Sequence, residues 1–347
     1  MKQQVQPSTL CDLEGPRPGQ GLRVHGSRRS ALAAIASALV PAVTGAQGST
    51  FRIAVVMGSP ENDRGRAMVA AFRTSLRELG WADGQRVNIR VWWGGANAAL
   101  MLSNAEELIR GGFDVHVVQT ATALRNVLRI APKTKTVFWA VSDPVSNGFV
   151  RELARPGGSV TGFSLYSYDM AGKWLELLRE TVPTVTSVFA LMGADNVNLA
   201  GWRTSLQEAS ARSGLRIIWN ELRGTADVAA ALTQASSTPN SSVLALADPF
   251  MSQDERSRLV SAHAHKVPII AATRRLGGQL LTYEVDQMSQ ARDAARYVSR
   301  ILHGERPGDL PVQAPQQFRL TVDRRASRAL GITVPHSVLL RADEVVD

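Results

Sequence analysis

Short hydroxyl, amide and carboxylate side chains follow several apolar runs of this sequence, at the points where the runs end. These residues are Ser59, Thr120, Thr122, Ser142, Asp143, Asn196 and Asp248. Such positions lie beside helix N-termini, whose free N–H groups and partial positive charge suit a ligand carboxylate. Asp143 or Asp248 can face a ligand ammonium, and Tyr283, Trp93 or Tyr166 can supply an apolar wall. Each residue alone can equally cap its own helix, whereas the set together favours a binding site.

Motifs of catalytic and metal sites are absent from the sequence. It contains no G-x-S-x-G, no Walker A sequence and no G-x-G-x-x-G that opens a helix after a strand. His263 and His265 stand two residues apart on a predicted helix, where positions i and i+2 point apart, so we expect no metal pair. His116 alternates with apolar residues and is expected to be structural. We therefore expect no catalysis, no cofactor and no metal.

The periodicity of apolar residues predicts strands that alternate with helices in two series. The first series has predicted strands at 51–57, 87–93, 114–119 and 136–141, and the second at 186–192, 215–219, 242–247 and 267–271. Helices of 10 or so residues between such strands imply parallel sheets covered on both faces. The fold class is therefore α/β, with two doubly wound, Rossmann-like lobes. Right-handed crossovers place all strand-to-helix loops at one edge of each sheet.

Pro- and Gly-rich breaks divide the chain into lobes. The break at 155–162 ends an N-terminal lobe of 51–162, and the break at 276–279 ends a C-terminal lobe of 163–275. Residues 276–347 hold too few elements for a third domain, so we expect them to return and complete the lobes, with parts of 280–347 in the first. Several connections then form a multi-strand hinge. The ligand is expected at the carboxyl ends of the strands, in the cleft between the lobes.

The first 46 residues have the parts of a secretory signal peptide with a long n-region. A polar segment ends in Arg28-Arg29, an apolar run spans 31–43, and small residues extend to Ala46. Cys11, the one cysteine, precedes the apolar run and so does not mark a lipoprotein anchor. We expect export to the periplasm with cleavage near Ala46, and the sequence leaves open whether the Sec or the twin-arginine route is used.

The net charge of +9 does not indicate nucleic-acid binding. Residues 1–46 carry five basic and two acidic residues, so the remaining chain has a net charge of +6. Its arginines and lysines are scattered along helix faces and mixed with acids, without aromatic platforms. A solvated surface explains this pattern better than a nucleic-acid interface.

Longer motifs resemble one family, the ABC-transporter substrate-binding proteins, in the class related to aromatic-amino-acid binders. The segments are 52–63, 70–81, 142–150 (SDPVSNGFV), 153–162 (LARPGGSVTG), 172–178, 300–313 and 329–335, so the resemblance covers about residues 51–345. It implies a type I periplasmic-binding architecture that closes on a small polar or zwitterionic solute, amino acids included. The partners it implies are a membrane permease with its ATPase, and we expect a monomer.

The resemblance also places individual residues in the cleft. The positions that match cleft residues of the family are Ser59, Thr120, Thr122, Asp143, Asp248 and Tyr283. Two departures argue against transferring a particular substrate. Thr282-Tyr283-Glu284 stands where Ser-Tyr-Gly is common, and Gly193-Ala194-Asp195 stands where Asn-Pro is common.

Two other functions fit the same lobes. The first is a periplasmic sensory or regulatory ligand-binding module, although the N-terminal residues provide no helix-turn-helix for a transcriptional version. The second is an enzyme that uses cleft acids, and the lack of cysteine after residue 46 excludes thiol chemistry there.

Overall fold

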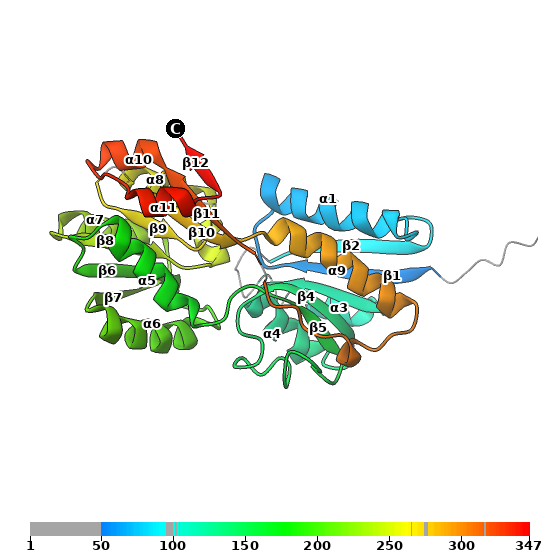
Figure 1. The fold of residues 1–347 in the computed structure, drawn as a ribbon. Helices are drawn as coiled ribbons and strands as arrows, with labels where there is room; N and C mark the ends of the chain where they lie inside the picture. The colour runs from blue at the N-terminus through cyan, green and yellow to red at the C-terminus, as the bar shows by residue number, and fades with distance from the viewer. Residues whose placement is uncertain are drawn as a thin grey trace, which may run out of the picture. The chain divides into compact units, whose positions relative to one another are not determined.

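The computed structural model describes residues 50–94, 100, 103, 105–264, 266–273, 277–315 and 317–347. The predicted signal peptide and His265 lie outside the described residues. Within the compact unit Gln47–Asp347, the strands form two sheets, and helices cover both faces of each (Figure 1). The predicted α/β fold with two lobes built on parallel sheets is thereby confirmed.

The first lobe contains a five-stranded sheet in the order β2-β1-β3-β4-β5. Its strands are β1 Phe51–Met57, β2 Val87–Trp93, β3 Val115–Gln119, β4 Lys135–Val141 and β5 Val160–Ser164. All neighbouring pairs are parallel. The helices between them are α1 Asp63–Glu78, α3 Ala105–Arg110 and α4 Ala121–Ile130. Strands such as β3, which is buried along its whole length, are apolar because helices cover both faces of the sheet.

The second lobe contains a seven-stranded sheet in the order β12-β11-β10-β9-β8-β6-β7. Its strands are β6 Ser187–Gly193, β7 Arg216–Leu222, β8 Ser241–Ala245, β9 Ile269–Ala271, β10 Leu281–Val285, β11 Phe318–Asp323 and β12 Glu344–Val346. Its helices are α5 Met170–Thr181, α6 Leu199–Ser213, α7 Thr225–Ser237, α8 Asp254–His263, α10 Arg324–Ala329 and α11 His336–Arg341, with a 3₁₀ turn η1 at Pro249–Ser252. Among these described strands, β11 runs antiparallel to β10 and β12 pairs parallel with β11, so these two strands run opposite to the other five, which are parallel to one another.

The C-terminal segments divide between the lobes. Strands β10, β11 and β12 extend the second sheet, whereas α9 Gln287–Leu302 packs beside α1 on the first lobe (Figure 1). On that lobe, Nε1 of Trp81 donates to Oγ of Ser299 in α9 at 3.0 Å. A 3₁₀ turn η2, Pro307–Asp309, follows on the same lobe, and Oγ1 of Thr161 in β5 donates to the carbonyl of Leu310 at 2.7 Å.

The described chain therefore passes between the lobes in three connections: after Ser164, after Val285 and after Gln313, which pairs with Phe163 on the first lobe. The first is fixed by Tyr166, which is fully buried and donates from its hydroxyl to the carbonyl of Ala272 at 2.6 Å. The Tyr166 ring also packs against the indole of Trp174, with ring centroids 5.2 Å apart. Lobes joined by several short connections can rotate about them while keeping their alignment.

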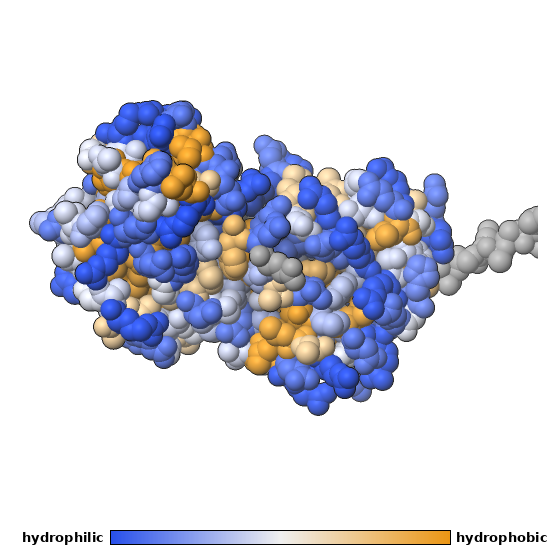
Figure 2. Space-filling model, viewed as in Figure 1, coloured by the Kyte–Doolittle hydropathy of each residue, from blue (hydrophilic) through white to orange (hydrophobic). Residues whose placement is uncertain are grey.

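The face of the unit seen in Figure 2 is mostly hydrophilic, with separate apolar areas. Scattered apolar side chains are normal on a folded protein. Among the described residues, no helix is both long and apolar enough to cross a membrane.

Candidate functional site

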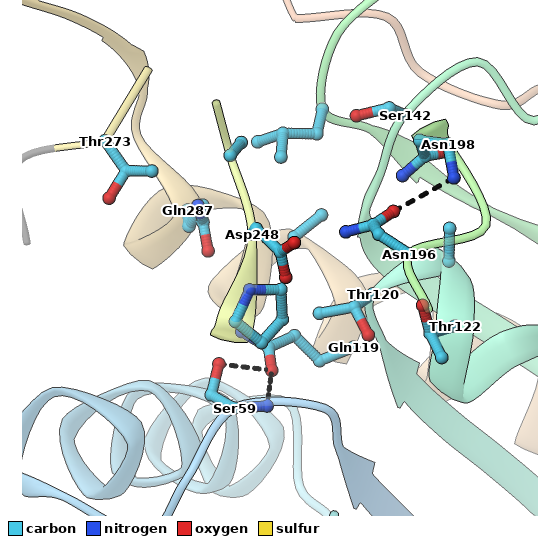
Figure 3. A pocket seen from close by; sticks show the side chains of 15 residues that line it. Ser59, Gln119, Thr120, Thr122, Ser142, Asn196, Asn198, Asp248, Thr273 and Gln287 are labelled. Atoms are coloured by element: carbon cyan, nitrogen blue, oxygen red, sulfur yellow. Dashed lines mark hydrogen bonds between the residues drawn. The ribbon is translucent and has the colours of Figure 1, made fainter. Parts of the chain in front are cut away.

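A small polar cavity of about 30 Å³ lies where the carboxyl ends of the two sheets meet (Figure 3). The first lobe contributes the residues that follow or end β1, β3 and β4, and the second lobe those that follow β6, β8 and β9. The polar lining residues are Ser59, Gln119, Thr120, Thr122, Ser142, Asn196, Asn198, Asp248, Thr273 and Gln287. This is the edge at which open parallel sheets bind ligands.

Six of the eight residues predicted to line the site lie around this cavity: Ser59, Thr120, Thr122, Ser142, Asn196 and Asp248. They meet because each follows a parallel strand, and parallel strands place their carboxyl ends at one edge. Whether they bind a ligand stays a prediction.

Asp143 and Tyr283 lie outside the cavity lining. Asp143 has a positive φ of 38°, and its Oδ1 accepts a hydrogen bond from the backbone N–H of Ser146 at 3.0 Å, so its carboxylate shapes a turn. Tyr283 stacks on Phe318 with ring centroids 5.4 Å apart, and burial raises the pKa of its hydroxyl. Successive side chains of a strand point to opposite faces, so the ring of Tyr283 and the side chain of Glu284 lie on opposite sides of β10.

The other two aromatic residues expected at an apolar wall also lie elsewhere. Tyr166 is fully buried in the core, where burial raises the pKa of its hydroxyl. Trp93 packs against Gly65 of α1 and lines a shallow groove on the first lobe. The aromatic residue closest to the expected role is Phe250, which lines the outer part of the site.

Gln119 organises the floor of the cavity. Its Oε1 accepts hydrogen bonds from the backbone N–H of Ser59 at 2.9 Å and from Oγ of Ser59 at 2.7 Å (Figure 3). The sequence places Gln119 at the end of an apolar strand, and an amide in an otherwise apolar run is the signal that could have marked it. The pair connects the ends of β1 and β3 and fixes the hydroxyl of Ser59.

The N-terminus of α4 points its first residues at the cavity, because Thr120, Ala121 and Thr122 line it. Thr120 caps this helix, and its Oγ1 accepts a hydrogen bond from the N–H of Ala123 at 3.5 Å. Its backbone has φ 81° and ψ 151°, a region that is almost restricted to glycine and costs about 1–3 kcal/mol for other residues. Ala140, which also lines the cavity, has a positive φ of 54°. Strain of this kind gathers at binding sites, where the surrounding structure maintains it.

Asp248 is the buried carboxylate of the site. Its Oδ1 accepts from the N–H of Phe250 at 2.9 Å and its Oδ2 from the N–H of Gly193 at 2.7 Å. Burial raises the pKa of Asp248, while these two N–H groups and the side chain of Asn196 favour its ionised form. Asp248 therefore caps η1 and ties the end of β6 to the end of β8, in addition to facing the cavity.

Three further polar residues of the cavity were not among the predicted ones: Asn198, Thr273 and Gln287. Asn198 is 6% exposed and occupies the N-cap of α6, but its side chain makes no capping hydrogen bond. Thr273 follows the short strand β9, and Gln287 opens α9 directly after the second connection between the lobes. Their positions depend on how the lobes meet, which the sequence pattern does not specify.

A wider pocket of about 390 Å³ opens from the cavity toward the outside. The two share the residues Thr120, Thr122, Asn196, Asp248 and Pro249. The outer pocket adds Phe250, Leu222 and other apolar groups, together with charged residues from both lobes. Its volume falls in the range of about 300–1,000 Å³ that is typical of small-molecule sites.

Within the described ranges, no three His, Cys, Asp or Glu residues come together in an arrangement that could hold a metal ion. His263 ends α8, and its Nδ1 lies 2.9 Å from the carbonyl of Leu259.

The chain matches known proteins over nearly its whole described length. The family model of the ABC transporter substrate binding protein matches residues 53–346. A tyrosine-binding protein of Clostridioides difficile is 23% identical over 272 residues, which cover 75% of each chain.

Solved structures show the same fold. One is a conserved domain protein of Vibrio cholerae, with 24% identity, a TM-score of 0.77 and coverage of 85% of this chain and 99% of that one. Another is an ABC domain from Streptococcus pneumonia in complex with L-Trp, with 21% identity, a TM-score of 0.77 and coverage of 86% and 100%. The ligand-free, open structure of a substrate binding protein from Clostridium difficile is 20% identical, with a TM-score of 0.61 and coverage of 86% and 99%.

Proposed function

Because the chain belongs to the family of ABC transporter substrate-binding proteins, which are not enzymes, we propose that it captures a small zwitterionic solute of the amino-acid type between its lobes. The solute is then delivered to a membrane permease for import. The protein acts without catalysis, as an exported periplasmic monomer whose partner is that permease with its ATPase.

The arrangement of charge around the cavity carries this proposal. The N-terminus of α4 offers a partial positive charge and N–H groups, which suit a carboxylate. The carboxylate of Asp248 lies on the other lobe and suits an ammonium. Each charge of a zwitterion can therefore contact an opposite charge on a different lobe, and contacts with both lobes favour the closed arrangement. The tyrosine-binding relative and the L-Trp complex support the amino-acid class.

A binding screen tests the proposal on protein that begins at Gln47. We expect at least one L-amino acid to raise Tm in a thermal-shift assay, because a ligand that binds only the folded state stabilises it by mass action. L-tyrosine, L-tryptophan and L-phenylalanine are the first candidates, with their D-enantiomers and their decarboxylated amines as controls. A lack of response to all L-amino acids, with a response to sugars instead, would overturn the amino-acid class.

The matched variants are Thr122→Val and Thr186→Val. Thr122 lines both the cavity and the outer pocket, and valine keeps its shape while removing the hydroxyl. Thr186 precedes β6 at the opposite edge of the second sheet, where its hydroxyl donates to the carbonyl of Asn240 at 3.4 Å. We expect Thr122→Val to weaken binding about tenfold, which corresponds to about 1.4 kcal/mol, and Thr186→Val to leave it unchanged. Equal affinities of the two variants would remove Thr122 from the site.

A further inference from the structure

The cavity and the outer pocket differ strongly in size, and this difference limits where parts of a solute can lie. The cavity of about 30 Å³ has room for about two water-sized groups. The outer pocket has about 390 Å³. A solute whose head group occupies the cavity must therefore place the rest of its structure in the outer pocket.

The outer pocket has an apolar wall with cationic groups beside it. Phe250, Leu222 and Val197 supply the apolar surface. Arg125 comes from α4 of the first lobe, and Arg223 comes from the turn between β7 and α7 of the second lobe. An aromatic or aliphatic solute body fits the apolar surface, and an anionic group at its far end fits the arginines.

Neither arginine forms a close ion pair with a carboxylate within the part of the chain that the structure describes. Nη2 of Arg125 donates only a long hydrogen bond of 3.4 Å, to Oδ1 of Asn147. The carboxylate of Asp227 accepts hydrogen bonds from the backbone N–H groups of Arg223 and Gly224, and the guanidinium of Arg223 interacts with it through charge only. The outer pocket is lined by two carboxylates, Asp248 and Asp195. Asp248 accepts hydrogen bonds from backbone N–H groups, whereas Asp195 is exposed and its negative charge repels an anion in the pocket.

We propose that the solute is an α-amino acid whose side chain ends in an anionic group, held between Arg125 and Arg223. This inference rests on the proposed function, since it takes the α-carboxylate and α-ammonium to lie at the mouth of the cavity, against the residues that the cavity shares with the outer pocket. The two arginines belong to different lobes, so the anionic group links the lobes and favours the closed arrangement. Asp195 weakens this contact and limits the affinity for the anion.

The experiment measures affinities by calorimetry for a series that shares one ring: L-phenylalanine, L-tyrosine, 4-amino-L-phenylalanine and 4-carboxy-L-phenylalanine. We expect the 4-carboxy compound to bind at least tenfold more tightly than L-phenylalanine. This preference should shrink as salt rises, because the arginines are solvent-accessible. Equal or weaker binding of the 4-carboxy compound would overturn the inference.

Three charge variants and one control measure the contribution of each charged residue to this preference. Arg125→Gln and Arg223→Gln should each reduce the preference for the 4-carboxy compound over L-phenylalanine about three- to tenfold. Asp195→Asn should increase the preference. The control is Arg129→Gln, an exposed residue in the last turn of α4 that does not line the pocket and should change nothing.

The outcomes also separate this inference from the proposed function. If L-phenylalanine and L-tyrosine bind but the 4-carboxy compound has no advantage, the inference is wrong and the amino-acid class stands. If no compound of the series and no other L-amino acid binds, the proposed function fails, and the inference fails with it.

Discussion

The side-chain amide of Asn147 donates a hydrogen bond of 2.9 Å to Oδ1 of Asn198 and so joins the first lobe to the second beside the cavity. The same amide nitrogen is held by the carbonyls of Ser142 and Asp143, each at 3.1 Å. The hydroxyl of Tyr168, in the first connection between the lobes, also donates to Oδ1 of Asn198, at 3.3 Å. Asn198 uses its side chain for this contact instead of capping α6, so the contact stabilises the arrangement in which the lobes meet.

Asn147→Ala should therefore weaken ligand binding about three- to tenfold, because a net hydrogen bond contributes about 0.5–1.5 kcal/mol to the closed arrangement. Calorimetry measures the affinity, and small-angle scattering of the ligand-free protein should show a larger radius of gyration. Asn220→Ala is the matched control, since its amide donates to the carbonyl of Ile218 within one strand. Unchanged affinity and radius in Asn147→Ala would show that this contact does not hold the lobes together.

The backbone of Thr120 gives a second prediction, which compares two substitutions at one residue. Thr120→Ala and Thr120→Gly both remove the hydroxyl, but only glycine adopts φ 81° and ψ 151° without strain. We expect Thr120→Gly to be more stable than Thr120→Ala by about 1–3 kcal/mol in urea unfolding.

The same pair of substitutions at Thr122 is the control, because Thr122 lies inside α4. There alanine should be more stable than glycine by about 1 kcal/mol, which is the ordinary order in a helix. If alanine is also the more stable at Thr120, the backbone there is not strained.

The ends of the strands could be predicted from the sequence, because a fully buried parallel strand consists of a short run of apolar residues. That is why Ser59 and Asp248, which follow β1 and β8 after short gaps, both lie at the cavity. Tyr283 lies outside the cavity lining, because the sequence pattern predicts the position of a residue along β10 but not which face of the sheet its side chain covers.

The sequence pattern also does not predict which lobe each C-terminal segment joins. Strands β10 and β11 carry ordinary strand residues, and their pairing with the second sheet is decided by packing between distant segments. Gln287 reaches the cavity only because α9 returns to the first lobe directly after β10. Cavity residues such as Gln287 can be identified only from the three-dimensional arrangement of the two lobes.

His116 gives a prediction for the pH dependence of stability. It is 2% exposed, and burial lowers its pKa from 6.5 to about 4. Between these pH values the unfolded chain takes up a proton that the folded protein does not. The contribution of His116 to the free energy of unfolding therefore has its full value above pH 6.5. It falls by about 3 kcal/mol as the pH drops to about 4.

His116→Leu should remove this dependence, and the difference between the two proteins in urea unfolding at several pH values isolates it. The comparison is necessary because Asp248, whose pKa is raised by burial, has the opposite effect just above its ordinary pKa. Parallel stability curves for wild type and His116→Leu would contradict the prediction.

Gly58 stands where β1 approaches Thr120 too closely for a side chain. A Cβ at Gly58 would lie 2.1 Å from Oγ1 of Thr120 and 2.8 Å from the carbonyl oxygen of Gln119. Gly58→Ala should destabilise the protein by about 1–3 kcal/mol through overpacking, and it should also weaken binding by separating Ser59 from Gln119.

The double variant Gly58→Ala with Thr120→Gly tests this cause, because it removes the nearer clash and leaves the one with the backbone of Gln119. Its loss of stability should be smaller than the sum of the two single losses by at least about 0.5 kcal/mol. Gly172→Ala in α5, where the nearest atom is 3.9 Å from the added carbon, should instead stabilise the protein by up to about 1 kcal/mol. Additive losses in the double variant would mean that Thr120 is not what excludes a side chain at Gly58.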